Sequence, residues 1–183
     1  MIFAVSDRWN LAPVFKMKKI LFIPLFFIII SLVILFNHAT KNYIIYSPPV
    51  DSMGPALQVG ENYFFRRYNS RRHVIKRGSI VILDMSDSVI GDFAAFRVIG
   101  LPNEKVELHK NYFLVDSQKI YYSDVIPNFR NLRPPERLRT WQYESISLDG
   151  NSIFVIGDDF WNVWDSRYFG GVSLDKVIGI FRL

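Results

Sequence analysis

The sequence contains no cysteine among its 183 residues. This absence excludes a disulfide framework, a thiolate nucleophile and cysteine-ligated zinc or iron–sulfur sites. The histidines are His38, His73 and His109, and no two of them have the four-residue spacing that favours a zinc site on a helix. We therefore expect no metal and no other cofactor. The remaining chemistry must come from hydroxyl, carboxylate, lysine or arginine groups.

The composition is that of a folded protein with one apolar segment set apart from the rest. Half of the residues are hydrophobic, and 22 basic against 17 acidic residues give a net charge of +5. Such a chain is too apolar for a disordered tail, and its length suits one domain with a sizeable core.

A long apolar run lies near the N-terminus. Residues 20–36 (ILFIPLFFIIISLVILF) contain no charge, and at about 1.5 Å per residue they cover most of a hydrocarbon core of about 30 Å. Lysines in the segment 16–19 precede it, so the positive-inside rule places residues 1–19 in the cytoplasm and residues 38–183 outside. A cleaved signal peptide is the alternative, but its apolar region is usually about 7–15 residues long and ends in small residues. The exit FNHATKNY lacks that feature, which favours an uncleaved transmembrane anchor.

The rest of the chain predicts short β-strands. They are β-branched or aromatic and are bounded by Gly, Asp or Ser, and no helical period is sustained after residue 40. The predicted strands are residues 62–68, 79–84, 93–99, 112–115, 119–122, 152–156 and 176–181, with a hairpin turn over 116–118. The pattern predicts an all-β sandwich or partly open barrel behind one N-terminal transmembrane helix.

Two segments read differently from strands. Residues 127–141, with two adjacent prolines and four arginines, predict a long surface loop. Residues 66–77 carry six basic side chains and no acid, which fits either attraction to membrane lipid headgroups or a solvated hairpin face. We expect no nucleic-acid partner, because an exported, tethered domain does not meet one.

Four strings occur in a fixed order along the exported part. They are residues 49–57 (PVDSMGPAL), 77–83 (RGSIVIL), 97–106 (RVIGLPNEKV) and 157–172 (GDDFWNVWDSRYFGGV). Together with the anchor they resemble type I signal peptidases, membrane-anchored serine endopeptidases that remove signal peptides from exported proteins. The resemblance implies a signal-peptidase-like β domain on the outer side of the bacterial cytoplasmic membrane. It implies signal peptides of preproteins as partners, with secretion machinery or an active paralogue as further ones.

The resemblance implies that some catalytic positions of the family are kept in this chain and others are replaced. Ser52 matches the nucleophile and the oxyanion-hole N–H, and Met53 matches the residue after it. Phe96 stands where the family carries the lysine base, and phenylalanine cannot accept a proton. Val163 replaces the polar residue that steadies the lysine, and Val50 replaces an extra hydroxyl donor of some members. The family's general base is therefore missing.

The resemblance also implies supporting residues and a substrate groove. Supporting ion pairs would come from Arg97 with Asp158, and from Asp165 and Arg167. The groove would lie between residues 46–50 and 93–95, where Val50, Ala94 and Ala95 line it and a bulky Phe96 can intrude. Aromatic residues of the fourth string can anchor the domain at the membrane or fill the volume of the lost lysine. The second interpretation is favoured for Trp164, and for Trp161 both stay open.

Two functions remain open at this stage. The first is a membrane serine endopeptidase that acts on preproteins through Ser52 with another base. The second is an inactive relative that binds exported chains or partners as a scaffold. Substitute bases such as Lys105, His73 or His109 must lie within hydrogen-bond reach of Ser52. Loss of a catalytic base usually lowers the rate by several orders of magnitude, which favours the scaffold.

Overall fold

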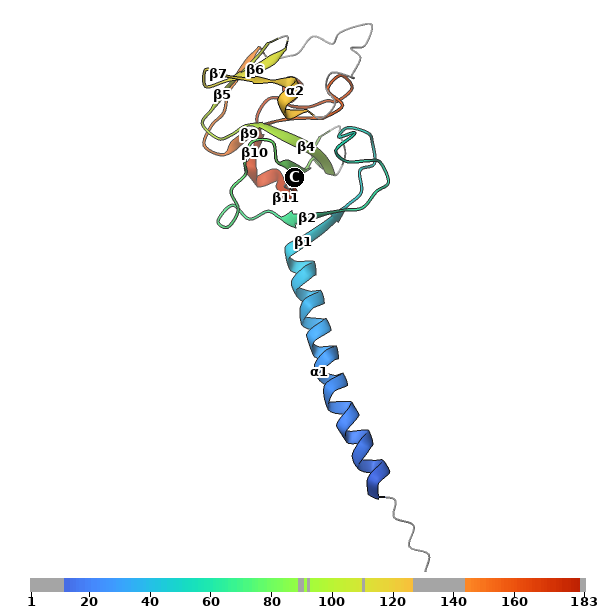
Figure 1. Cartoon of the computed structure of the whole chain (residues 1–183). Helices are drawn as coiled ribbons and strands as arrows, with labels where there is room; N and C mark the ends of the chain where they lie inside the picture. The colour runs from blue at the N-terminus through green and yellow to red at the C-terminus, as the bar shows by residue number, and fades with distance from the viewer. Residues whose placement is uncertain (1–11, 89–90, 92, 110, 127–143, 182–183) are drawn as a thin grey trace, which may run out of the picture. The chain divides into compact units, whose positions relative to one another are not determined.

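The computed structural model describes residues 12–88, 91, 93–109, 111–126 and 144–181, with side chains from Phe22 onward. It divides into two units (Figure 1). The first unit ends at Asn42, and the second begins at Tyr43. The first contains helix α1 (Ala12–Asn42). Its segment Phe22–Asn42, with mean hydropathy 2.3, is long and apolar enough to cross a membrane. The exact limits of the membrane span and of the exported domain stay predictions.

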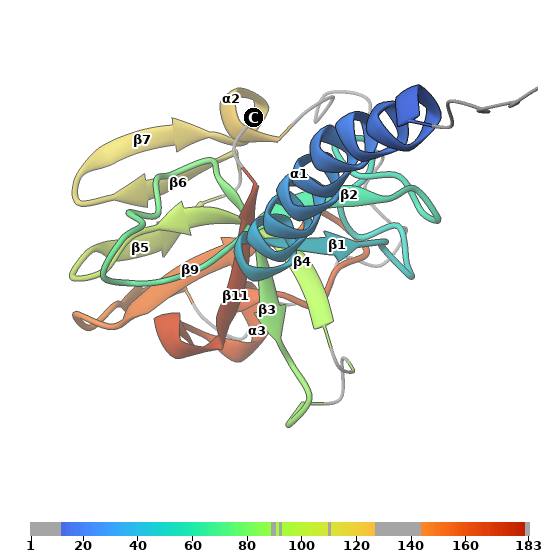
Figure 2. The same cartoon turned by 90° about the horizontal axis from the view of Figure 1, so that it is seen from below.

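The second unit is built from eleven described strands in two antiparallel sheets. Their bounds are β1 (Tyr43–Tyr46), β2 (Tyr63–Arg67), β3 (Ile80–Asp84), β4 (Phe93–Gly100), β5 (Lys105–Leu108), β6 (Tyr112–Val115), β7 (Gln118–Tyr121), β8 (Ser145–Ser147), β9 (Ser152–Ile156), β10 (Val172–Ser173) and β11 (Val177–Phe181). Short helices α2 (Tyr122–Val125), α3 (Ser166–Phe169) and η2 (Leu174–Lys176) connect them. One sheet has the order β1-β2-β11-β3-β4-β9-β10 and the other β7-β6-β5-β8. Figure 2 shows β5, β6 and β7 side by side at one end of this unit. The predicted all-β class with one N-terminal helix is confirmed.

Several local predictions need correction. The β6–β7 turn contains only Asp116 and Ser117, both at positive φ, because Gln118 already pairs with Val115. A two-residue turn with two positive φ angles matches the twist of the flanking strands better than the predicted three-residue turn. Strands β1, β5, β8 and β10 have four residues or fewer, and the sequence analysis missed them. The predicted surface loop 127–141 lies outside the described residues.

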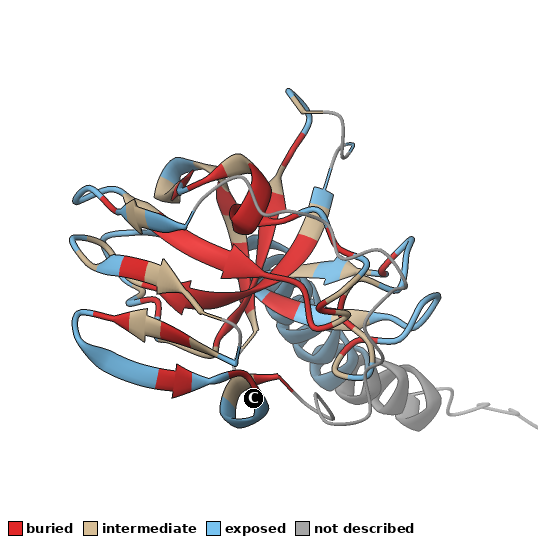
Figure 3. Cartoon of the chain, turned by 90° about the horizontal axis from the view of Figure 1, so that it is seen from above, coloured by how far each residue is buried: buried red, intermediate tan, exposed pale blue. Residues whose placement is uncertain are grey.

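Strand β4 separates two apolar clusters. Successive side chains of a strand point to opposite faces, so Ala95 packs in a cluster with Met53 and Phe65, whereas Phe96 packs in another with Val98. A third cluster joins the four-stranded sheet to β4 and β9 through residues such as Phe154. Figure 3 shows the buried residues concentrated in these central strands, with exposed residues in the connecting turns. The site predicted around Ser52 and Phe96 is thus built on the most buried part of the sheet.

Candidate active site around Ser52

The loop between β1 and β2 carries Ser52 and is held from two sides. Met53 and Leu57 are fully buried against the inner face of the sheet, and the Leu57 N–H donates to the Met53 carbonyl at 2.9 Å. The Asp159 N–H donates to the Ser52 carbonyl at 3.1 Å. Apolar anchoring and this backbone bond fix Ser52 beside the loop that contains the fourth string.

The Ser52 hydroxyl has no activating partner in the described part of the chain, and the Ser52 backbone N–H is already used in a hydrogen bond. Among the described residues its hydroxyl makes no hydrogen bond, and its N–H donates to the Val50 carbonyl at 2.9 Å. A serine nucleophile needs a base to take its proton, and an oxyanion hole needs a donor aimed at the developing charge. In this conformation Ser52 has neither.

The positions assigned to the base and to its support lie in one hydrocarbon cluster. Phe96 is 1% exposed and Val163 is 7% exposed, and both belong to the cluster on the outer face of β4. The Phe96 ring packs edge-to-face on Phe169, with ring centroids 6.2 Å apart. Val163 also lies so close to Gly157 that a Cβ there would come within 2.5 Å of a Val163 methyl group. Neither Phe96 nor Val163 carries an atom that can accept a proton.

Phe96 and Ala95 lie on opposite faces of β4, whereas Phe96 packs in the same cluster as Ala94, the other predicted groove residue of this strand. The intrusion of Phe96 on the substrate pocket stays a prediction. The Phe96 ring packs against Phe169. Trp164 is 45% exposed and stacks on Tyr168 at 4.5 Å, so the interpretation that Trp164 fills the volume of the lost lysine is wrong.

The other aromatic residues of the fourth string pack inward. Phe160 is 1% exposed in the cluster under the four-stranded sheet. Trp161 packs on the same cluster, with its ring 4.9 Å from that of Phe160. These contacts give both rings a packing role within the β unit.

The substitute bases considered from the sequence have other contacts. Lys105 forms an ion pair with Glu107 at 2.7 Å, and His109 stacks on Tyr112 at 4.6 Å. His73 accepts the Asn69 N–H at its Nδ1, 3.1 Å away. Across the part of the chain that the structure describes, none of the three forms a hydrogen bond or ion pair with Ser52.

A buried ion pair supports the site from the other end of β4. Arg97 binds Asp158 with two parallel hydrogen bonds, Nε to Oδ1 at 2.7 Å and Nη2 to Oδ2 at 2.6 Å. Its Nη1 donates to the Gly78 carbonyl at 2.8 Å. Burial raises the pKa of Asp158, and the Arg97 guanidinium partly offsets that rise. The pairing expected from the sequence is present and joins the second, third and fourth strings.

Asp165 and Arg167 form a second buried pair inside the fourth string. Asp165 caps α3 by accepting the Arg167 N–H and also accepts the Gly157 N–H at 3.0 Å. The Arg167 guanidinium binds the Asp165 carboxylate at 2.7 Å and donates to the Phe160 carbonyl at 2.6 Å. These bonds fix the path of the loop that holds Val163. A role of either pair in catalysis stays a prediction.

The ion pair between Arg77 and Glu104 was missed by the sequence analysis. Arg77 binds Glu104 with two hydrogen bonds of 2.7 and 3.1 Å, and Glu104 also accepts the Leu101 N–H at 2.7 Å. The basic segment 66–77 is therefore partly neutralised by an acid outside it. An arginine in the second string and a glutamate in the third were the available signals, but the pairing itself is non-local.

Part of β4 offers an unpaired edge. Strand β3 pairs with Phe93–Arg97, whereas β9 pairs with β4 only from Arg97 onward. Across this edge the Tyr46 hydroxyl faces the Ala95 backbone; burial raises the pKa of Tyr46, and hydrogen bonding to Ala95 partly offsets the rise. Ala94 is half-buried, and Val50 is 61% exposed. A role of this edge as the substrate groove stays a prediction.

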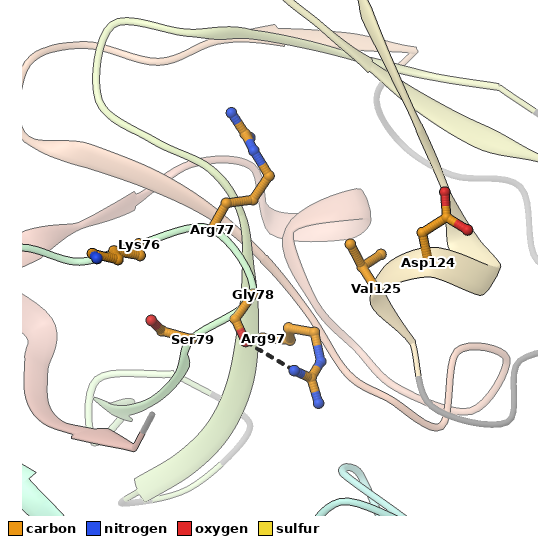
Figure 4. Close-up of a pocket in the computed structure, with 7 residues that line it drawn as sticks. All are labelled: Lys76, Arg77, Gly78, Ser79, Arg97, Asp124 and Val125. Carbon is orange, nitrogen blue, oxygen red and sulfur yellow. Dashed lines mark hydrogen bonds between the residues drawn. The ribbon is translucent and has the colours of Figure 1, made fainter. Parts of the chain in front are cut away.

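A pocket of about 500 Å³ does not include Ser52 in its lining. Figure 4 shows its lining residues, Lys76, Arg77, Gly78, Ser79, Arg97, Asp124 and Val125. Its three basic side chains point in different directions. Arg77 and Arg97 are already bound to carboxylates. The pocket therefore supplies no converging cations and no group for the chemistry of Ser52.

Replacing Ser52 by alanine is expected to change the free energy of unfolding by less than about 0.5 kcal/mol, because its hydroxyl makes no bond in the described structure. Thermal unfolding of the full chain measures this. A loss of more than about 1 kcal/mol would reveal a hydroxyl partner that contradicts this description of the site. A neutral result makes Ser52→Ala a clean control for activity.

Comparison with known proteins agrees with the four strings. A signal peptidase I-2 of Synechocystis sp., named as probable, is 25% identical over 135 residues, which cover 72% of this chain and 57% of that relative. Signal peptidase I P of Bacillus subtilis subsp. natto is 26% identical over 157 residues, covering 85% of this chain and 84% of the relative. The chain thus spans little more than half the length of the Synechocystis protein.

A solved structure and a family model complete the comparison. The crystal structure of a signal peptidase I from Enterococcus faecalis V583 is similar with a TM-score of 0.49 and 24% identity, covering 60% of this chain and 98% of that one. The family model described as signal peptidase, peptidase S26, matches residues 17–183, which include most of α1 and all of the β unit. The chain therefore belongs to the signal peptidase family, and its apolar N-terminal helix is that of a membrane-anchored protein.

Proposed function

We propose that this chain recognises the signal peptides of exported preproteins and binds them without cleaving them at the rate of a Ser–Lys peptidase. Family membership supports the substrate class. The absence of cleavage is supported by the observation that Phe96 and Val163 lie in one apolar cluster. It leaves no proton acceptor at the position of the family's base.

The mode of binding is strand addition to the free edge of β4. An extended signal-peptide tail would pair with the backbone of Phe93–Ala95, next to the Ser52 loop. Main-chain hydrogen bonds supply affinity in this mode, and Ala94 and Val50 are placed to contact small side chains of the tail. Tyr46 would have to release the Ala95 backbone when the tail binds.

The second candidate function is a slow serine endopeptidase. It is favoured by one observation, the retention of Ser52 in a loop fixed by Met53 and by the Asp159 N–H. Removal of a catalytic base lowers turnover by about 10⁴- to 10⁶-fold in well-studied serine proteases. If water is the only proton acceptor for Ser52, we therefore expect this chain to cleave more slowly than the lysine-containing members of the family, by a factor of that order.

The proposed location follows the charge flanking the anchor. Residues 1–19 lie in the cytoplasm, residues 20–36 span the bacterial cytoplasmic membrane, and residues 38–183 face the outer side. Signal peptides emerge at that side of the membrane. Secretion machinery or an active peptidase are the partners that a non-cleaving, signal-peptide-binding protein would serve.

Site-directed disulfide crosslinking tests the binding mode, because the natural chain has no cysteine. Phe93→Cys places one thiol at the β4 edge, where Phe93 is 50% exposed. A preprotein with a single cysteine near the end of its signal peptide is expected to crosslink to this variant in detergent-solubilised full chain. The mature protein with the cysteine at its N-terminus, without the signal peptide, is expected not to.

Tyr121→Cys is the matched control. Tyr121 has a similar exposure of 47% but lies on β7, an edge strand of the other sheet. Equal crosslinking at both positions, or at neither, would contradict strand addition at β4. Crosslinking of the mature protein as efficient as that of the preprotein would contradict signal-peptide recognition.

A further inference from the structure

The outer face of strands β1 and β2 exposes apolar side chains. Ile45 and Phe64 lie directly opposite each other on the two strands, and they are 62% and 65% exposed. The inner face of the same strands is used for the core, with Phe65 fully buried. Scattered apolar residues need no explanation on a surface, but an exposed cross-strand pair forms a continuous apolar patch.

A pocket of about 400 Å³ adjoins this pair, and its lining is Tyr43, Phe64, Arg66, His73, Ile180 and Phe181. Arg66 lies between Tyr43 on β1 and Ile180 on β11, its partners in the ladder. The pocket therefore combines apolar and aromatic walls with the guanidinium group of Arg66 and the imidazole ring of His73. Among the described residues, its lining contains no carboxylate.

The polar groups of the pocket are ready to donate hydrogen bonds. Within the described residues Arg66 forms no ion pair, in contrast to Arg77. The Nδ1 atom of His73 accepts the Asn69 N–H, so the neutral ring carries its proton on Nε2 and can donate there. An arginine with a histidine donor suits a phosphate group, which accepts several charge-assisted hydrogen bonds.

The chain itself brings this pocket to the membrane. The candidate membrane-spanning segment Phe22–Asn42 is followed directly by Tyr43, which lines the pocket. At about 3.3 Å per residue, Ile45 lies no more than about 10 Å from the last residue of that helix. The patch is therefore tethered within a short length of chain to any membrane that holds the helix.

We propose that this pocket binds one anionic phospholipid, with its phosphate on Arg66 and His73 and an acyl chain along Phe64 and Ile45. The site differs from the signal-peptide edge of β4, and it assigns the exposed apolar pair a ligand. Within the basic segment 66–77, it assigns lipid binding to Arg66 and His73. Arg71 and Arg72 are exposed and lie outside the pocket lining, so they contribute only diffuse attraction.

Native mass spectrometry of the detergent-solubilised full chain tests the site by counting bound phosphatidylglycerol and phosphatidylcholine. The natural chain is expected to bind one phosphatidylglycerol in preference to phosphatidylcholine. Arg66→Gln is expected to weaken that binding about fivefold, the usual effect of one basic residue near anionic lipid. His73→Gln and Phe64→Ser are each expected to weaken it severalfold. Arg66 and Phe64 are exposed and His73 is half-buried, so all three variants are expected to fold.

Arg71→Gln is the matched control, since it removes the same charge from the same segment without touching the pocket. An equal loss in Arg66→Gln and Arg71→Gln would overturn the site in favour of a diffuse basic surface. Unchanged binding in Arg66→Gln and His73→Gln would also overturn it. Full displacement of the lipid by soluble glycerol phosphate would show that the acyl chain contributes nothing and would overturn the lipid assignment.

Discussion

Replacing Asp158 by alanine is expected to lower the free energy of unfolding by about 3–5 kcal/mol, because it leaves the Arg97 guanidinium buried without its counter-ion. Asp158 is fully buried and Arg97 is 3% exposed, so water cannot replace the lost carboxylate without opening the structure. The two N–H donors that face Asp158 would lose their acceptor together. Urea unfolding of the full chain in detergent measures the loss.

The neighbouring residue provides a matched control for this prediction. Asp159 is half-buried, and its carboxylate binds only the Asn162 amide among the described residues. Asp159→Ala keeps the backbone bond to Ser52 and is expected to cost less than about 1 kcal/mol. Equal losses in the two variants would show that the Arg97–Asp158 pair does not support the site in the way described.

Replacing Phe96 by lysine is expected to destabilise the protein and to restore cleavage. The amine would enter a cluster that holds Val163 and Phe169, and the burial would cost about 2–4 kcal/mol at neutral pH. Desolvation lowers the pKa of such a lysine, which makes it neutral and able to act as a base. We expect a gain in preprotein cleavage of about 10²- to 10⁴-fold, the usual contribution of a general base.

The stability of this variant carries its own pH signature. The unfolded lysine keeps its proton up to a pKa of about 10.4, whereas the buried amine has already lost it. The unfolded state then binds more protons, so the stability deficit relative to the natural chain shrinks as the pH rises towards that value. A deficit independent of pH would show that the new amine is solvated rather than buried.

Two further variants separate a base from a merely buried amine. Val98 lies on the same face of β4 as Phe96 and is equally buried, so Val98→Lys is expected to destabilise the chain without any cleavage. Val163→Ser, added to Phe96→Lys, supplies a hydroxyl for the amine and is expected to recover part of the stability. Ser52→Ala in the same background is expected to abolish the gain. Absence of a gain in folded Phe96→Lys would contradict the assignment of Phe96 to the position of the family's lysine base.

Most elements of the fold could be predicted from local patterns in the sequence. Short runs of β-branched or aromatic residues bounded by Gly, Asp or Ser located the strands β3, β4 and β9, and the uncharged run located the N-terminal helix. Strands β8 and β10, of three and two residues, were missed because so few positions cannot show a period. The β6–β7 turn was misjudged by one residue, since its length depends on the pairing of Val115 with Gln118.

The site was predictable in its residues but not in its geometry. The strings identified Ser52, Phe96 and Val163, and the bond between Arg97 and Asp158 was expected from the same source. The bond from the Ser52 N–H to Val50 and the pairing of Arg77 with Glu104 depend on loop conformation and on contacts between distant strands. Trp164 was misplaced because its exposure depends on stacking with Tyr168, which no spacing encodes.

The most direct test of the central claim is cleavage of a preprotein by the natural full chain beside its Ser52→Ala variant. The missing base at Phe96 predicts the same rate for both, indistinguishable from the rate without protein, while the preprotein remains bound. Cleavage by the natural chain that disappears in Ser52→Ala would contradict this account. It would establish a serine endopeptidase that uses a base other than the family's lysine.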